Sequence, residues 1–461
     1  MKLARPSICL LPIWLAILLL AGPIDLHSEG PLFVGGPPRP GLPSVPGKPF
    51  IWTINPLTYW TDQGALATTL PKSDADNLVQ QAFQAWQDVP TASISFNKAG
   101  DLPQDVTAGN ILTVLSQLYD CGTTLTSSSL ARARTIIYDT DGSAIRAMGD
   151  DPTMVLGVSS PACFASDGIN NYFQRGFMIL NGKPVSSGQH SLAELQSTMI
   201  HEFGHLIGLD HSQVNLNCLT GACMADDLTG VPIMFPVAVV GERTTLSTDD
   251  VAGVSALYPE AVNAPPGQVA FSTLGRIQGR VVFSDGVTPA QGFNVIARQV
   301  DDPSTPTVNE SRKVAASNVS GFLFTACVGV PDTVIPPPNN NCGTDPSTSG
   351  SRDESLISFF DIPGLPLDSG QQYTLEVEAI HDSSPNPFIG SSSVGPIGAI
   401  GFQFRLLTPC SPLFLWSPTA SCTDKAELQP VAGQVLNTGT DIVLTGTTGT
   451  LPRYDVWEDG P

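Results

Sequence analysis

Residues 201–211 read HEFGHLIGLDH, and this stretch decides the organisation of the first half of the chain. His201 and His205 are four positions apart, so on a helix their side chains lie on the same face. Two imidazoles one turn apart can bind a single metal ion, and Glu202 can reach a water molecule bound to that ion. The spacing therefore predicts a helix that carries a metal site.

Gly208 and His211 complete the predicted site. Gly208 falls where the helix should end, because glycine readily adopts the left-handed conformation of a sharp turn. That turn can bring His211 back as a third ligand. Three protein nitrogens leave one coordination position for water, which is typical of a catalytic zinc site rather than a structural one.

The alternative is that a His-Glu-x-x-His pattern stands on a surface helix by chance. The chain has 6 histidines, and half of them lie within this one stretch at ligand spacing. We therefore predict one catalytic zinc ion, held by His201, His205 and His211. Glu202 is predicted to be the general base, which takes a proton from the zinc-bound water and passes it to the leaving amine.

Hydrophobic periodicity predicts the elements around this site. Helices are expected to begin at Ser73, Ser191 and Ser247, since serine is a favourable N-cap, and Asp250 would complete a capping box with Ser247. Strands are expected at residues 50–61, 91–100, 110–118, 134–142 and 175–182.

The character of the sequence changes beyond Pro265. Short alternating segments at 275–283, 292–300 and 373–380 are separated by turns rich in Pro, Ser, Gly and Asn, which is typical of an all-β sandwich. At the other end, Lys2 and Arg5 precede an apolar run, as in a signal peptide. The expected organisation is a signal peptide at 1–28, a Pro/Gly-rich linker or short pro-segment at 29–49, a catalytic domain at 50–262 and a β-sandwich at 270–450.

The chain of 461 residues has a net charge of −21, which argues against nucleic acid and against anionic lipid as partners. An acidic surface can simply keep an exported protein soluble, or some of its carboxylates can bind calcium. Residues 139–142 read DTDG, so Asp139 and Asp141 are candidate calcium ligands. An ordinary acidic turn with glycine is an equally good interpretation.

The chain has 9 cysteines, and one of them, Cys9, lies in the expected signal peptide. The even number that is left suggests disulfides in an oxidising compartment. Pairing nearest neighbours gives 121–163, 218–223, 327–342 and 410–422, although the sequence by itself leaves the connectivity open.

The motif resembles that of the metzincin peptidases, and within them the matrixin family. The pattern His-Glu-x-x-His-x-x-Gly-x-x-His is complete, and Ser212 after the third histidine also fits matrixins. Residues 231–236, VPIMFP, resemble the family's methionine turn, with Met234 as its methionine. Residues 246–259, LSTDDVAGVSALYP, resemble its C-terminal helix.

The resemblance covers about residues 50–259 and implies an α+β metzincin-type domain, with a twisted mixed sheet and three helices. It implies peptide-bond hydrolysis, and a substrate pocket formed in part by Pro232, Ile233 and Phe235. The sequence departs from animal matrixins at residues 38–43, PRPGLP. There Pro40 stands in place of the cysteine that holds those enzymes latent.

The C-terminal part resembles carboxypeptidase-regulatory-like or transthyretin-like sandwiches, which usually act as spacers or binding modules. A secreted metalloendopeptidase acting on extracellular protein or peptide substrates is thus the leading hypothesis, with the periplasm or the cell surface as other locations. We expect a monomer and no membrane contact beyond the signal peptide. The alternative is a non-catalytic, zinc-containing surface or adhesion protein whose β-sandwich binds a partner.

Overall fold

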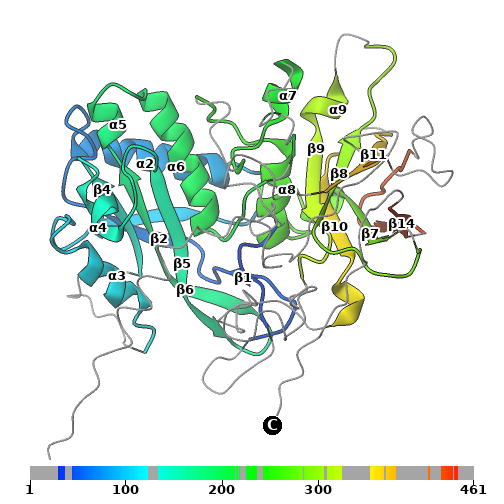
Figure 1. The fold of residues 1–461 in the computed structure, drawn as a ribbon, viewed down its shortest axis with the longest axis horizontal. Coiled ribbons are helices and arrows are strands. Elements are labelled where there is room, and N and C mark those ends of the chain that lie inside the picture. Colours follow the sequence, from blue (N-terminus) through cyan, green and yellow to red (C-terminus); the bar gives the residue numbers. More distant parts are fainter. Residues whose placement is uncertain are drawn as a thin grey trace, which may run out of the picture.

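The structure is a computed structural model of the 461-residue chain, and Figure 1 shows its fold. It describes residues 30–36, 44–122, 133–212, 214–215, 218, 225–235, 242–283, 285–305, 309–323, 353–367, 370–379, 414–415, 427–439 and 441–444. The expected signal peptide lies outside the described residues. No helix in the described part of the chain combines the length and the apolar character needed to cross a membrane.

A six-stranded sheet forms the centre of the N-terminal half. Its strands are β1 (Phe50–Ile51), β2 (Leu57–Thr61), β3 (Phe96–Asp101), β4 (Arg134–Asp139), β5 (Gly157–Ser166) and β6 (Asn171–Asn181). Five of them are parallel in the order β1-β6-β4-β2-β3, while β5 pairs antiparallel with β6. The mixed sheet implied by the resemblance is therefore present.

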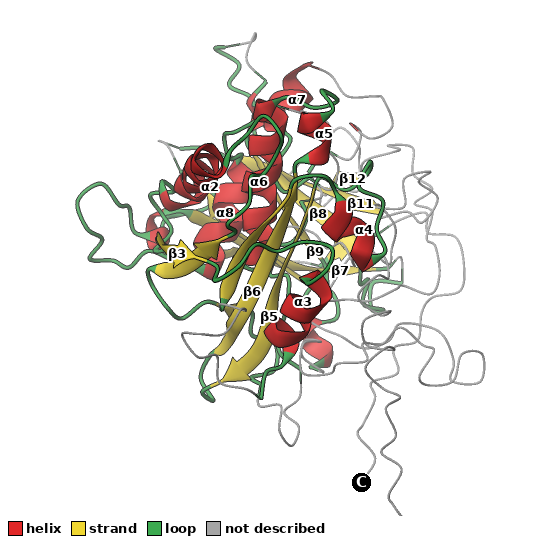
Figure 2. Cartoon of the chain, turned by 90° about the vertical axis from the view of Figure 1, so that its left-hand side faces the viewer, coloured by secondary structure: helices red, strands yellow, loops and turns green. Residues whose placement is uncertain are grey.

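Helices cover both faces of this sheet. The helices of this half are α2 (Lys72–Gln87), α3 (Ile111–Tyr119), α4 (Ser143–Met148), α5 (Lys183–Ser186), α6 (Leu192–Leu206), α7 (Ala225–Gly230) and α8 (Thr248–Leu257). Of these, α2 and α6 lie on one face and α3 and α4 on the other, while α7 and α8 contact the C-terminal half. Successive residues of a strand point to opposite faces. Accordingly Ile136 and Tyr138 of β4 share a core with α2 and α6, while Ile137 packs with α3 and α4 on the other face (Figure 2).

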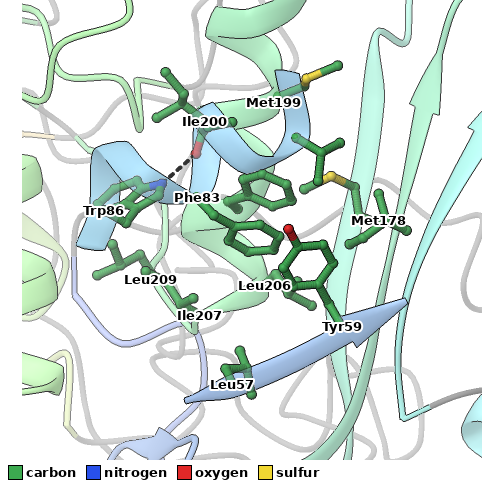
Figure 3. Packing of buried hydrophobic residues seen from close by; sticks show 14 of the residues in the cluster. Leu57, Tyr59, Phe83, Trp86, Met178, Met199, Ile200, Leu206, Ile207 and Leu209 are labelled. Atoms are coloured by element: carbon green, nitrogen blue, oxygen red, sulfur yellow. Dashed lines mark hydrogen bonds between the residues drawn. The ribbon is translucent and has the colours of Figure 1, made fainter. Parts of the chain in front are cut away.

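The packing of α2 on α6 fixes the position of the predicted metal-binding helix. The ring of Phe83 stacks on that of Phe203, with centroids 3.6 Å apart. The indole N–H of Trp86 donates to the carbonyl of Ile200 at 2.9 Å, as Figure 3 shows. This bond satisfies a buried polar group within an otherwise apolar cluster.

Three predictions of secondary structure were wrong, and the described part of this half has seven helices rather than the three that the resemblance implies. Residues 50–61, expected as one strand, form β1 and β2 with a break between them. Residues 110–118, expected as a strand, form helix α3, because Ile111, Val114 and Leu118 recur at helical spacing and are fully buried. Helix α2 begins after Pro71, and its N-cap makes no side-chain hydrogen bond, so Ser73 is not the cap. The expected caps of the other two long helices, Ser191 and Ser247, are confirmed.

The segment before residue 50, where the catalytic domain was expected to begin, packs against the end of helix α6. Leu32 donates its backbone N–H to the carbonyl of Gly208 at 2.7 Å, and Asp210 donates to the carbonyl of Gly30 at 3.2 Å. Val34 is completely buried. The residues of this segment that contact α6 are therefore ordered against the fold, unlike those of a loose linker. The role of residues 29–49 as a short pro-segment stays a prediction.

The C-terminal half contains two four-stranded sheets with an apolar core. One sheet contains β7 (Gly275–Val282), β10 (Phe359–Leu365), β13 (Val435–Asn437) and β14 (Ile442–Val443), and the other contains β8 (Phe293–Gln299), β9 (Ala315–Val319), β11 (Tyr373–Ala379) and β12 (Phe414–Leu415). The short helices of this half are η2 (Phe271–Thr273) before β7, α9 (Glu310–Lys313) between β8 and β9, and η3 (Glu354–Leu356) before β10. The described strands fit the predicted sandwich, and residues 284, 306–308, 324–352, 368–369, 380–413, 416–426, 440 and 445–450 of the expected domain lie outside the described residues.

One disulfide of the expected set is present between described residues, that of Cys121 with Cys163. Cys218 is disulfide-bonded, and Cys223, its expected partner, lies outside the described residues. The other two expected pairs also lie outside them.

Candidate metal centre

Helix α6 carries the first two histidines and is firmly capped. The Ser191 hydroxyl accepts the N–H of Glu194 at 3.1 Å, and the Glu194 carboxylate accepts the N–H of Ser191 at 2.7 Å. The helix ends at Leu206, and Gly208 follows in the left-handed region with φ of +95°. A Cβ on Gly208 would lie 2.9 Å from the ring of Phe173, so the turn requires glycine.

The turn brings the three predicted ligands together. The Nε2 atoms of His201, His205 and His211 lie 3.1–3.2 Å from one another. Ligand nitrogens around a tetrahedral zinc ion, each 2.0–2.1 Å from it, lie roughly 3.4 Å apart. In the described part of the chain, no other three His, Cys, Asp or Glu side chains form a comparable group.

Hydrogen bonds at the opposite ring nitrogens assign the tautomers of two of these histidines. His201 Nδ1 lies 2.7 Å from the carbonyl oxygen of Ile233, and His205 Nδ1 lies 2.9 Å from that of Leu209. A carbonyl only accepts, so both Nδ1 atoms carry the proton and both Nε2 atoms have a lone pair. Lone pairs aimed at one another repel unless a cation lies between them, so the residues present fit a metal ion. Burial also lowers the pKa of His201, which keeps the imidazole neutral as a ligand must be.

Glu202 follows His201 on helix α6 and is buried. Burial raises the pKa of its carboxyl to about 8. Strand β5 passes directly over this carboxyl at Gly157, where an added Cβ would lie 2.7 Å from Glu202 Cγ. A carboxyl group next to a metal site with a raised pKa is suited to accept and release a proton.

Comparison with known proteins supports this interpretation of the geometry. Residues 51–259 match the family model described as Matrixin. The chain is a zinc metalloendopeptidase. No curated protein and no solved structure matched the chain.

Met234, the expected methionine of the turn, packs against helix α6 at Gly204, the residue before His205. It is completely buried, and its sulfur packs on Gly204 so closely that a Cβ there would overlap it. The Met234 backbone is held on both sides: its N–H donates to Asp250 at 2.9 Å, and its carbonyl accepts from Ser212 at 2.7 Å. This turn therefore connects the residue after His211 to helix α8.

The other residues of the methionine turn are also buried. Pro232, Ile233 and Phe235 are almost inaccessible to solvent, and the Phe235 N–H donates to the carbonyl of Pro232 at 3.3 Å. Ile233 also accepts from His201. The substrate pocket expected at these residues stays a prediction.

Asp139 and Asp141, the candidate calcium ligands, each accept a backbone hydrogen bond. Asp139 accepts the N–H of Ile145 at 2.8 Å, and Asp141 accepts that of Ser143 at 3.0 Å. Burial raises the pKa of Asp139, while hydrogen bonds from Ser143 lower that of Asp141. The alternative of an acidic turn explains these contacts, and calcium binding stays a prediction.

Sequence reasoning missed three residues that shape the site. Gly157 shows no local signal, because its importance comes from the approach of Glu202. Asp249 was not singled out, and Asp250 was predicted only as the capping-box partner of Ser247, although it also accepts the backbone N–H of both Ile233 and Met234. The position of these two residues after Ser247 predicts a helix cap. It does not predict the residues elsewhere in the fold to which their carboxylates bond.

Proposed function

We propose that the peptidase cleaves extracellular protein or peptide substrates, with Glu202 as the general base. The observation that carries this proposal is the convergence of three imidazole Nε2 atoms beside a buried carboxyl group on the same helix. His201, His205 and His211 would hold zinc, which supplies a Lewis acid for the peptide carbonyl and for the attacking water.

Glu202 would move the proton during hydrolysis. Its carboxylate takes a proton from the water whose oxygen bonds to the carbonyl carbon. It then gives that proton to the leaving nitrogen as the peptide bond breaks, so the carboxylate is regenerated. Because Gly157 has no side chain, the carboxyl group keeps room for this exchange.

The outer edge of strand β5 would bind the peptide. Asn181 donates its N–H to the carbonyl of Leu156 at 3.0 Å. The backbone N–H and C=O groups of the even-numbered residues of β5 therefore bond to β6, and those of the odd-numbered residues point outward from the sheet edge. The backbone groups of Gly157 and Ser159 are then available to an extended substrate, beside Glu202. Pro161 has no N–H, so it could not donate a backbone hydrogen bond to the substrate at that position.

Export from the cytoplasm fits the Cys121–Cys163 disulfide and the signal-peptide character of residues 1–28. The exported chain is expected to be a monomer, which light scattering would test.

Cleavage of unfolded casein or gelatin tests the proposal. The chain from Gly30 to Pro461 is compared with its Glu202→Ala variant, with and without a zinc chelator. The wild type should cut the substrate, and both the variant and the chelated enzyme should lose the cleavage. A wild type that binds zinc stoichiometrically but cuts neither substrate would favour the surface or adhesion protein instead.

A further inference from the structure

The outer face of the sheet β12-β11-β8-β9 is covered by the catalytic domain. Ile296 of β8 and Ala315 of β9 pack against Val214, which lies three residues beyond the third histidine, and all three are buried. Their neighbours Val295 and Ala316 point the opposite way, into the core of the sandwich. A face that a free sandwich would present to solvent thus contacts the loop after His211.

A buried cation on this face holds the same loop. Arg298 Nη1 donates to the side-chain oxygen of Asn215 at 3.0 Å, and Arg298 Nε pairs with Glu376 at 2.6 Å. Asn215 in turn donates to the carbonyl of Asp227 at 3.2 Å. Because Glu376 compensates its charge, the guanidinium can remain buried and fix the loop.

Asp249 of helix α8 connects the sandwich to the residue next to His211. One carboxylate oxygen accepts the hydroxyl of Ser212 at 2.5 Å, and the other accepts the backbone N–H of Ser317 at 2.7 Å. The Ser317 hydroxyl also donates to Asp249, at 3.3 Å. All three residues are buried, so this carboxylate joins the metal-ligand loop to strand β9.

Strand β9 can supply this donor because it lies at the edge of its sheet. Ser320 donates its N–H to Phe293, and Gln299 donates to the carbonyl of Val314, so the even-numbered residues of β9 pair with β8. The N–H of Ser317 consequently points away from β8 and toward Asp249.

We propose that the C-terminal sandwich is a fixed part of the metal centre, in which Ser317 and Arg298 position His211 through Asp249 and Asn215. This inference rests on the proposed zinc site. The groups that orient a metal ligand commonly change metal affinity 10–100-fold when they are removed. The sandwich is thereby a support for the third ligand and not a detachable spacer.

Ser317→Pro in the full exported chain tests the inference. Proline removes the N–H given to Asp249 but no bond of the β8–β9 ladder, and edge strands tolerate it. Two quantities are measured: the rate at which a chromophoric chelator removes zinc, and the visible spectrum of the cobalt(II)-substituted protein. We expect zinc loss about tenfold faster than in wild type, and an altered cobalt spectrum.

Arg298→Gln and Ser317→Ala give the same readouts with smaller changes, and they decide the matter if Ser317→Pro does not fold. Arg280→Ala is the control, because Arg280 lies on β7 of the other sheet and donates to Ser358 in the turn before β10. It should leave both readouts as in wild type. Variants that fold and bind zinc with wild-type loss rates and spectra would overturn this inference alone. A wild type that takes up no zinc would overturn the proposed function and this inference together.

Discussion

Asp250 accepts the backbone N–H of Met234 at 2.9 Å, and this bond fixes the methionine turn to the first turn of helix α8. The same carboxylate accepts the N–H of Ile233 at 2.9 Å and of Ser247 at 2.6 Å. This buried side chain therefore caps helix α8 and also fixes the backbone of Ile233 and Met234 next to the candidate metal centre. The Ile233 carbonyl then orients His201 through its Nδ1.

Asp250→Ala should destabilise the fold strongly, since three buried N–H donors would lose their acceptor. We expect a loss on the order of 3–5 kcal/mol in the free energy of unfolding, and weaker zinc binding. Ser247→Ala removes only the cap of α8 and should cost about 1 kcal/mol. Urea denaturation compares the two variants. Similar losses would show that the bonds from Asp250 to the turn contribute little.

Gly204→Ala should damage the packing of α6 over the methionine turn, because the new methyl group would overlap the sulfur of Met234. We expect a loss of about 3 kcal/mol, at the upper end of the range for overpacked cores. Gly109→Ala is the control: a Cβ there meets only Thr107 Oγ1, at 3.6 Å. The denaturation midpoints of the two variants should differ clearly. A Gly204→Ala protein as stable as wild type would contradict the described packing.

Glu202→Gln separates proton transfer from metal binding. The amide has nearly the same shape but cannot accept the proton, so kcat should fall at least about 100-fold. Zinc content should stay at one ion per chain, because the three imidazoles are unchanged. Stability should not fall, since burial already disfavours the carboxylate. Substantial residual cleavage in Glu202→Gln would assign the base to another residue.

The Asp76 carboxyl should make the free energy of unfolding depend on pH in the acidic range. Burial tends to raise its pKa, but hydrogen bonds from Lys72, Lys98 and Tyr138 outweigh burial and lower the pKa below 3.8. A lowered folded-state pKa adds stability above 3.8, which is lost as the pH falls through the folded-state value. The stability difference between wild type and Asp76→Asn, measured by urea denaturation, should therefore shrink below pH 3.8. A difference that does not change with pH would contradict this.

The segment before residue 50 should contribute to stability. A chain that begins at Phe50 lacks the burial of Leu32 and Val34, each worth about 1.5–3 kcal/mol. It also loses the bond from Leu32 to Gly208. We expect it to unfold at a clearly lower urea concentration than a chain that begins at Gly30. Equal urea midpoints for the two chains would show that residues 30–49 contribute little to stability, as expected of a linker.

Much of the candidate site was predictable because its determinants are local. His201 and His205 are four residues apart, so a helix places both side chains on the same face. Gly208 marks the turn that brings His211 back to them. The capping serines of α6 and α8 were predictable for the same reason, as was the alternation that makes β7, β8 and β11 strands. Residues 110–118 were misassigned because the short apolar run was interpreted as a strand, although Ile111, Val114 and Leu118 already have the spacing of one helix face.

The sequence by itself determined the chemistry of the metal centre, since helical geometry places the ligands within a few residues of one another. Only the tertiary structure decided what surrounds them. Gly157 lies over Glu202, Asp250 holds Met234, and Ser317 of the sandwich reaches Asp249. These contacts join residues far apart along the chain, and they depend on how sheets and helices pack. Local propensity and spacing carry no information about such packing.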